Sequence, residues 1–401
     1  MSGIKMQRVR KIVAMLCALF VFESTLSVAF YRGITHDVPG ANDFYVPWRA
    51  SQALVREGLN PYSPEVTRQI QIGMFGRERA PGEHSFAFAY PLYTALLLAP
   101  LIWLPYDAAQ AVWYALLLPL LLVTGMVALR NLHISPSRPA LLSTAVWMIF
   151  FYPAARSLIL GQLALVVCAS VVLAWWCVRQ SMDTLAGVLL ALTTIKPQMV
   201  FLILPVALWW AWHGAARRRR RLLVGFGLTF GALVVGSLLM QPSWPLDFIE
   251  TARAYSGYFD SQSPLQILVG NDALALGLSL VAVMAWLVTV AYTSARGWHG
   301  LMRLFMWGIV ITQLVAVHTA TTNQIMLMLP IFYVLRSSPA LKWWAALGAF
   351  LVVPWGVFLL TKQGNVESPL ALLPLGIGVA AWWFADEWMR LRHAPSRELA
   401  T

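Results

Sequence analysis

Few side chains in this 401-residue chain could do chemistry, because 59% of its residues are hydrophobic and only 11% are charged. An acid, Asp43, lies in the polar stretch ANDFYVPWRASQALVREGLNPYSPE, and Lys196 precedes Pro197 at the end of an apolar run. A carboxylate within hydrogen-bond reach of a hydroxyl can act as a general base, and a cation at membrane depth can bind a phosphate. Asp43 could equally cap a short helix, and Lys196 could equally extend its charged end to the membrane surface.

Three further residues join this set of candidates. Arg156 lies a few residues before Gly161-Gln162, and Arg49 belongs to the polar stretch quoted above. Arg156 is a second candidate for binding a phosphate, whereas Arg49 could bind a phosphate or the headgroups of lipids. Glu23 lies inside the first apolar run, where an acid is either functional or a hydrogen-bonded structural group.

The elements that must position these residues are helices in a membrane. Apolar stretches of about 20 residues recur along the chain, each long enough to cross a bilayer core, and backbone groups in lipid must pair internally. We distinguish thirteen apolar segments in all, and several of them are shorter than a full span. The segment Tyr90–Pro105 is short and bounded by prolines, so it is the first candidate for a re-entrant piece. The sequence therefore predicts an all-α, polytopic protein with about 12 spans.

The net charge of +12 comes largely from short basic clusters between apolar segments. One cluster, Lys5 to Lys11, precedes the first apolar run, and Arg217 to Arg221 stands between two later ones. Such clusters mark the cytoplasmic side of a membrane protein, so the charge does not indicate nucleic-acid binding. The long polar segments 32–85 and 241–271 are then expected at the outer face. We predict one multi-pass domain over residues 1–401 in the plasma membrane, with membrane lipids as its surroundings.

The polar stretch, with an acid just after the first apolar run and then NPY, resembles the first outer loop of glycosyltransferase family 87. Within that stretch, apolar residues at helical spacing predict a short amphipathic helix along the membrane interface, with Trp48 at the headgroup level and Asn42 or Asp43 as its cap. Four more segments resemble the family in the same order: FAYPLYTALLLAPLIWLP (Phe88 to Pro105), LGQLALVV (Leu160 to Val167), AGVLLALTTIKPQ (Ala186 to Gln198) and SQSPLQILV (Ser261 to Val269).

The resemblance implies a C-type membrane fold with a large first outer loop. It also implies an inverting transfer of a mannosyl or arabinofuranosyl residue from a polyprenyl-phosphate sugar to a glycan or glycolipid at the outer face. The family places the general base at the position of Asp43, with Asp37 as the alternative. The substrate-binding residues expected on this basis are Lys196, Arg156, Gln162, Arg49, His318, Asn323 and Gln324.

One of these expectations concerns a departure from the family pattern. Related enzymes often have a histidine-rich corner where this chain has AVHTATTNQ, with His318 as its single histidine. We expect this corner to bind acceptor hydroxyls through its amides and hydroxyls. No metal and no cofactor is expected, because the donor is a monophosphate and no acidic pair resembles Asp-x-Asp.

Another class of protein shares several of these features. A transporter or flippase for a lipid-linked sugar would have a similar number of spans and similar basic inner loops. Transporters often show an internal repeat and broken helices near the middle of the bilayer. No such repeat is evident here, and the polar residues gather toward one face, which favours the enzyme. The sequence does not identify the acceptor or the oligomeric state.

Overall fold

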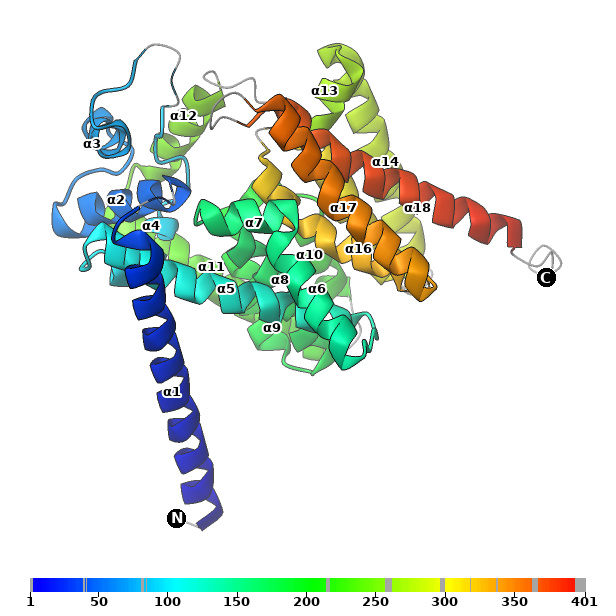
Figure 1. Cartoon of the computed structure of the whole chain (residues 1–401), viewed down its shortest axis with the longest axis horizontal. Helices are drawn as coiled ribbons and strands as arrows, with labels where there is room; N and C mark the ends of the chain where they lie inside the picture. The colour runs from blue at the N-terminus through cyan, green and yellow to red at the C-terminus, as the bar shows by residue number, and fades with distance from the viewer. Residues whose placement is uncertain are drawn as a thin grey trace. The chain divides into compact units, whose positions relative to one another are not determined.

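The computed structural model describes residues 3–38, 40, 42–80, 83, 85–213, 217–256, 262–295, 300–317, 319–336, 338–362 and 367–393. These residues form helices joined by turns and contain no strand. The all-α prediction is therefore confirmed for the described part of the chain (Figure 1).

The α-helices, in chain order, are α1 (Gly3–Phe30), α2 (Asn42–Arg56), α3 (Pro64–Phe75), α4 (Tyr93–Leu98), α5 (Tyr106–Asn131), α6 (Arg138–Phe150), α7 (Tyr152–Ile159), α8 (Ala164–Arg179), α9 (Asp183–Leu192), α10 (Ile203–His213), α11 (Arg217–Met240), α12 (Trp244–Ser256), α13 (Pro264–Val269), α14 (Asp272–Ala295), α15 (Leu301–Val315), α16 (Met328–Leu335), α17 (Ala340–Thr361) and α18 (Leu373–His393). A π-helical turn η1 (Tyr31–Thr35) continues α1, and five 3₁₀ turns are η2 (Ala99–Leu101), η3 (Thr193–Ile195), η4 (Pro197–Met199), η5 (Thr321–Leu327) and η6 (Pro369–Leu372).

Within the described residues, 5 helices are long and apolar enough to cross a membrane. They cover Val13–Thr35, Tyr106–Asn131, Arg219–Met240, Asp272–Ala295 and Ala340–Thr361. A sixth span results if α6 and α7, which are bent by 59°, are counted together. Five apolar helices of 10–17 residues are shorter than a full span.

This arrangement fits an integral membrane protein, but it gives fewer full-length spans than the 12 that the sequence predicts. The difference arises because apolar helices such as Asp183–Ile195 and Thr321–Leu335, even with their 3₁₀ turns included, have only 10–17 residues. The segment Tyr90–Pro105 forms only α4 and η2, so it does not cross a bilayer as a single helix. Its predicted re-entrant course stays a prediction.

The chain divides into two compact units, each assembled from separate stretches. Unit 1 contains residues 1–121, 158–163 and 236–258, and unit 2 contains residues 122–157, 164–235 and 259–401. The prediction of a single domain is a statement about the whole chain and stays a prediction.

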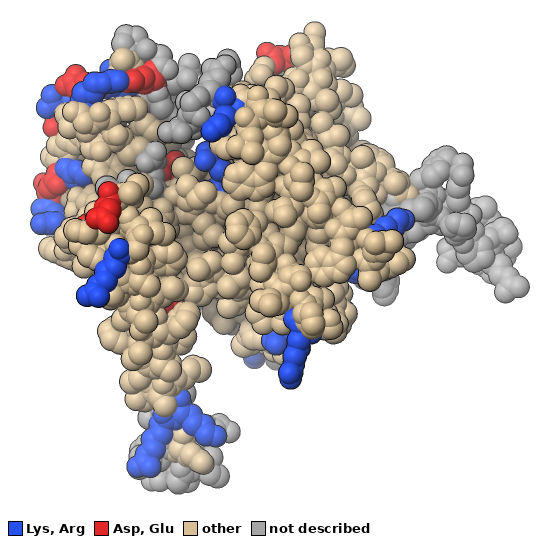
Figure 2. All heavy atoms as spheres, viewed as in Figure 1, with Lys and Arg blue, Asp and Glu red and all other residues tan. Residues whose placement is uncertain are grey.

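In unit 1, α1 is apolar and exposed. No residue in its most apolar stretch is buried by the rest of the chain, and large side chains such as Phe20 stand on its surface. Figure 2 shows basic side chains gathered at the N-terminal end of α1 and apolar surface along its length. An exposed apolar helix with a basic end is the pattern that a membrane-spanning helix presents.

The predicted amphipathic helix in the first loop is α2, and its apolar face is covered by protein. Phe44, Ala50 and Ala53 are buried, and α2 packs against α4 and η2 (Figure 1). Trp48 is only 6% exposed and its Nε1 donates to the carbonyl oxygen of Leu101 at 3.2 Å. Trp48 therefore packs inside unit 1 and does not project from the helix into its surroundings, and its placement at the headgroup level stays a prediction.

Local sequence fixes where the first-loop helices begin and end. Gly58 follows α2 with a φ of 66°, a conformation that glycine adopts without steric cost. The Ser63 hydroxyl accepts a hydrogen bond from Val66 N at 3.3 Å, so Ser63 caps α3, and Pro64 takes the first helical position. Gly76, with a φ of 71°, ends α3.

In unit 2, the Ala-Gly motif of the AGVLLALTTIKPQ segment has a packing role. A Cβ on Gly187 in α9 would come within 2.0 Å of the Leu222 carbonyl oxygen in α11. A Cβ on Gly225 in α11 would come within 2.1 Å of the Thr184 carbonyl oxygen. These two glycines therefore allow the backbones of α9 and α11 to touch, as small residues do between helices in membranes.

Candidate active site

Asp43 lies in the first turn of α2, which begins at Asn42. The two expected caps, Asn42 and Asp43, therefore lie in the first turn of the helix and not before it. The first turn is still the positive end of the helix dipole, which favours a carboxylate. Asp43 is partly exposed, unlike its neighbour Phe44.

The Gly161-Gln162 turn lies beside the start of α2. The amide nitrogen Nε2 of Gln162 donates to Oδ2 of Asp43 at 2.5 Å, although the two residues are 119 positions apart. Gln162 is only 7% exposed. Gly161 has a φ of 64°, which turns the chain sharply between α7 and α8. Two segments that resemble the family at separate places in the sequence thus meet through these two side chains.

Backbone and indole contacts hold this turn in place. Phe44 N donates to Leu160 O at 3.2 Å, and Trp113 Nε1 on α5 donates to Gly161 O at 2.8 Å. The ring of Phe44 stacks on that of Trp113, with centroids 5.1 Å apart and planes 10° apart. Because these contacts fix both the turn and the residue after Asp43, the Asp43–Gln162 pair rests on a rigid support.

Tyrosine side chains crowd the same end of α2. The ring of Tyr45 meets Tyr106 edge to face at 4.8 Å, and Trp48 lies 5.1 Å from Tyr106. Burial raises the pKa of Tyr45, and the Arg49 charge opposes this only in part. The phenol of Tyr45 therefore stays neutral at physiological pH and cannot compete with Asp43 as a base.

The NPY motif connects the first loop to two other segments of unit 1. Asn60 Nδ2 donates to Asp247 Oδ2 on α12 at 2.9 Å, and its Oδ1 accepts from Tyr62 N at 3.0 Å. The Tyr62 hydroxyl donates to the carbonyl of Tyr90, in the segment that resembles the aromatic-Tyr-Pro motif, at 2.7 Å. Burial, together with the negative charge of Asp247, raises the pKa of Tyr62, so this hydroxyl remains a donor.

These contacts bear on the predicted topology. Asn60 belongs to the polar segment 32–85 and Asp247 to the segment 241–271, and a hydrogen bond joins them. The two segments therefore lie on one side of any bilayer that the chain crosses. Which side this is remains a prediction from the basic clusters.

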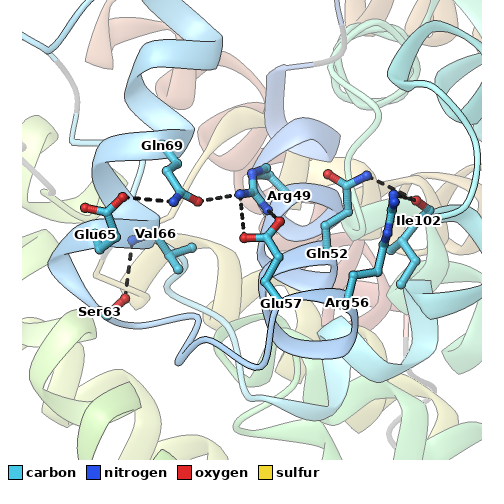
Figure 3. A network of polar contacts seen from close by, with 9 residues as sticks. All are labelled: Arg49, Gln52, Arg56, Glu57, Ser63, Glu65, Val66, Gln69 and Ile102. Atoms are coloured by element: carbon cyan, nitrogen blue, oxygen red, sulfur yellow. Dashed lines mark hydrogen bonds and ion pairs between the residues drawn. The ribbon is translucent and has the colours of Figure 1, made fainter.

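Arg49 is engaged in a protein network (Figure 3). Its Nη1 and Nη2 atoms bind both carboxylate oxygens of Glu57 at 2.8 and 2.9 Å, and Nη2 also contacts Gln69 Oε1 on α3. The Arg49 side chain is 14% exposed. Six positions along α2 turn the helix by about 240° beyond one full turn, so Arg49 and Asp43 lie on different faces. The predicted role of Arg49 toward a phosphate is untested, and its guanidinium already has an anionic partner.

Arg156, in unit 2, also faces an acid. Its Nη2 lies 4.0 Å from Oε2 of Glu367, and its charge lies 5.3 Å from the ring centroid of Phe358. Glu367 further accepts hydrogen bonds from the Thr321 hydroxyl at 2.7 and 2.8 Å and from the Tyr152 hydroxyl. Sequence reasoning missed Glu367, although an acid between two apolar segments was a usable signal.

Lys196 lies at a break between two 3₁₀ turns in unit 2. Its φ of −129° and ψ of 76° leave the helical region, as the following proline requires, so the predicted broken-helix corner is confirmed. Lys196 is 4% exposed, which is less than a lysine that extends to the membrane surface would show. Its predicted role in phosphate binding remains untested.

The corner after α15 is a buried polar turn. Asn323 and Gln324 are 2% and 0% exposed, and Gln324 Nε2 donates to Leu372 O at 2.7 Å. The oxygens Asn323 Oδ1 and Gln324 Oε1 have no hydrogen-bond partner in the described part of the chain. His318 lies outside the described residues, so its predicted role is not addressed.

The remaining acidic candidates are separate from these contacts. Asp37 is exposed in the link between η1 and α2. Glu23 on α1 has a buried Oε2 without a hydrogen-bond partner in the described ranges. Across those ranges no group of three His, Cys, Asp or Glu residues is arranged to hold a metal ion, and the expectation of no metal stays a prediction.

Comparison with known families places these contacts in context. The model of glycosyltransferase family 87 matches residues 88–330, which is more than half of the chain. Gln162, Lys196 and Arg156 lie inside the matched range, whereas Asp43 precedes it. No curated protein and no solved structure gives a match.

Proposed function

This chain belongs to glycosyltransferase family 87, and we propose that it is an inverting membrane glycosyltransferase in which Asp43 is the general base. The donor is a polyprenyl-phosphate sugar that carries a mannosyl or arabinofuranosyl residue, and the acceptor is a glycan or glycolipid. The observation that carries the proposal is the hydrogen bond between Asp43 and Gln162, which links the first loop to the family-matched region.

The chemistry follows from the position of that carboxylate. In a single displacement, the acceptor hydroxyl attacks the anomeric carbon and passes its proton to an Asp43 oxygen. The bond from the anomeric carbon to the phosphate oxygen breaks, and polyprenyl phosphate leaves with the electron pair. Gln162 donates to Oδ2 and so orients the carboxylate, while the aromatic contacts around Phe44 keep its backbone fixed.

Lys196 is the first candidate for binding the leaving phosphate. It is buried at a break in a helix, where a cation gains most from an anionic ligand. Arg156 is a second candidate, and Oε2 of Glu367 lies 4.0 Å from its Nη2. An apolar cavity of 270 Å³ in unit 2, lined by α8, α10 and α15, has the character that a polyprenyl tail requires.

The remaining features follow the sequence-based expectations. The reaction site lies at the outer face of the plasma membrane, where the two long polar loops of unit 1 are expected. The transfer uses no metal and no further cofactor, because the donor is already activated by its phosphate. Asn323 and Gln324 carry buried polar groups that could bind hydroxyls.

Turnover of Asp43→Asn tests the assignment of the base. Asparagine keeps the size of the side chain and can still accept from Gln162, but it cannot take a proton from the acceptor. Turnover per folded molecule should fall by about 10²–10⁴, the usual contribution of a positioned base. Membranes are supplied with radiolabelled polyprenyl-phosphate mannose or arabinofuranose, and labelled product is measured beside Asp37→Asn as the control.

Near-normal turnover in Asp43→Asn would contradict the role of Asp43, and loss in Asp37→Asn would move the base to Asp37. Movement of intact lipid-linked sugar across the membrane, without a labelled glycoside, would favour the transporter.

A further inference from the structure

Unit 1 contains a concave feature that none of the proposed steps uses. A pocket of 630 Å³ lies between α3, the irregular segment Ser85–Ala87 and α12. This volume falls within the range of about 300–1,000 Å³ that small-molecule sites occupy. Its walls come from both polar loops, which the Asn60–Asp247 hydrogen bond joins at 2.9 Å.

Most of the residues that line this pocket carry polar groups. All but three of the lining residues, Pro64, Ala87 and Ala254, carry a hydroxyl, an amide or a charge. Hydroxyls and planar amides or carboxylates, which can donate or accept in pairs, are the groups that bind the hydroxyls of a sugar. An apolar ligand would leave these groups without partners, at a cost in affinity.

One lining group points to a missing ligand. Ser85 is 5% exposed, and its Oγ has no hydrogen-bond partner in the described part of the chain. Its backbone is held, because Gln71 Nε2 donates to Ser85 O at 2.8 Å. A buried hydroxyl without a partner costs free energy that a bound hydroxyl would recover.

The charges of the pocket indicate which ligand it accepts. Arg68 lies 3.0 Å from Glu78 Oε1, and Arg79 Nη1 donates to Glu83 O at 2.8 Å, so both arginines have protein partners. Asp247, held by Asn60 and by the Ser243 hydroxyl at 2.7 Å, and Glu250 add two negative charges from α12. Two carboxylates repel a phosphate and accept hydrogen bonds from neutral hydroxyls.

The helix that forms one wall also contacts the helix that carries Asp43. A Cβ on Gly73 of α3 would overlap the hydroxyl of Tyr45 on α2, and Gln69 of α3 contacts Arg49. Thr67 and Gln71 of the same helix line the pocket. A ligand held against α3 is therefore bound by the element that packs directly on the catalytic helix.

We propose that this pocket is the binding site for a neutral, polyhydroxylated acceptor, a saccharide whose hydroxyls contact Ser85, Gln71 and the α12 carboxylates. That this saccharide is the acceptor rests on the proposed function, but binding of a saccharide can be measured without any transfer. The pocket disfavours phosphate-bearing headgroups, because the charges of Arg68 and Arg79 act on Glu78 and Glu83 and its α12 wall carries two carboxylates.

The binding test uses the full chain in detergent, with Cys17, Cys168 and Cys177 replaced by alanine and Thr67→Cys added as the reporter. Mannobiose, arabinobiose and maltose are the neutral probes, and glycerophosphoinositol is the anionic probe. We expect at least one neutral disaccharide to slow maleimide labelling of the reporter, with no effect of the anionic probe. Protection by glycerophosphoinositol alone, or by no probe, would overturn the proposal.

A matched pair of variants on α12 tests the location of the binding site. Thr251→Trp fills the pocket, whereas Ile249→Trp adds the same side chain at an exposed position that does not line it. The first variant should abolish protection by the disaccharide and raise the acceptor KM at least about tenfold, with the donor KM unchanged. Equal behaviour of the two variants would contradict the proposal.

The transferase activity and the saccharide pocket can be contradicted separately. If the wild-type chain binds a disaccharide but forms no labelled glycoside from any donor, the proposed transferase activity fails and the saccharide pocket stands. If transfer occurs and depends on Asp43 but Thr251→Trp leaves the acceptor KM unchanged, the activity stands and this pocket is not the acceptor site.

Discussion

The first turn of α2 and the rest of the helix carry polar side chains of opposite charge, and their partners differ. In the middle of the helix, Arg49 pairs with Glu57, 8 residues away, and with Gln69, 20 residues away. Gln52 and Arg56 on the same half donate to the carbonyl of Ile102 at 3.1 and 3.3 Å (Figure 3). At the N-terminal end, Asp43 meets Gln162 across 119 residues.

For Arg49 and Asp43, this difference separates a scaffold from a site. The contacts of Gln52 and Arg56 also reach the family-matched region, but they end on the backbone carbonyl of Ile102 and not on a side chain. The Arg49 network closes the link between α2 and α3 and is satisfied by residues of the same loop. The Asp43 contact requires a turn from the family-matched region to be brought against the first loop. A polar group whose partners are close in the sequence stabilises a loop. A polar group whose partner is distant in the sequence shows that two separate segments meet at one place in the structure.

Lys196 provides the strongest test of this distinction, because it is a cation like Arg49 and belongs to the other unit. If it binds the donor phosphate, Lys196→Met should reduce donor use by about ten- to a hundredfold, since a charge-assisted hydrogen bond contributes about 1.5–3 kcal/mol. Lys196→Arg keeps the charge and should lose less. The measurement is kcat and donor KM per folded molecule. Unchanged constants in Lys196→Met would class Lys196 with the scaffold.

Gln162→Glu tests whether residue 162 neighbours the catalytic carboxylate at the N-terminal end of α2. A second carboxylate 2.5 Å from Asp43 would raise the pKa of the pair, so one proton would be retained at neutral pH. A base with a raised pKa works only above that pKa, so turnover at pH 7 should fall by about tenfold and recover as the pH rises.

The pH–rate profile of Gln162→Glu is compared with that of Gln162→Ala. The alanine variant loses the hydrogen bond without adding charge, so its profile should keep the wild-type shape at a lower rate. Identical profiles for the two variants would show that Gln162 does not neighbour the catalytic carboxylate.

The smallest effect is expected for the Arg49–Glu57 pair. This ion pair is partly exposed, and pairs of this kind contribute about 0.3–1 kcal/mol to the free energy of unfolding. Arg49→Ala, Glu57→Ala and the double variant should lower thermal stability by similar small amounts, because either change breaks the same contact. Turnover per folded molecule should stay near the wild-type value. A tenfold loss of turnover in Arg49→Ala alone would move Arg49 from the scaffold to the site.

The sequence predicted several parts of this site because the signals are local. The proline after Lys196 predicts the break in the helix there, and the apolar spacing around Phe44 predicts α2. Other parts were not predictable. Glu367 lies 46 residues from Thr321, and nothing in either segment indicates that they meet. Trp48 was expected among lipid headgroups, but its burial depends on Leu101 in another helix.

By itself, the sequence determined that this is an all-helical chain suited to a membrane and that it belongs to a glycosyltransferase family. It also identified Asp43 and Gln162 as candidate site residues. These conclusions depend on the length of apolar runs, on turn residues and on motifs, all of which are contained in short stretches. Only the tertiary structure decided that Asp43 contacts Gln162, that Arg49 is paired with Glu57, and that Asn60 joins Asp247 beside a polar pocket. Those facts depend on the packing of side chains from separate helices, which no single stretch specifies.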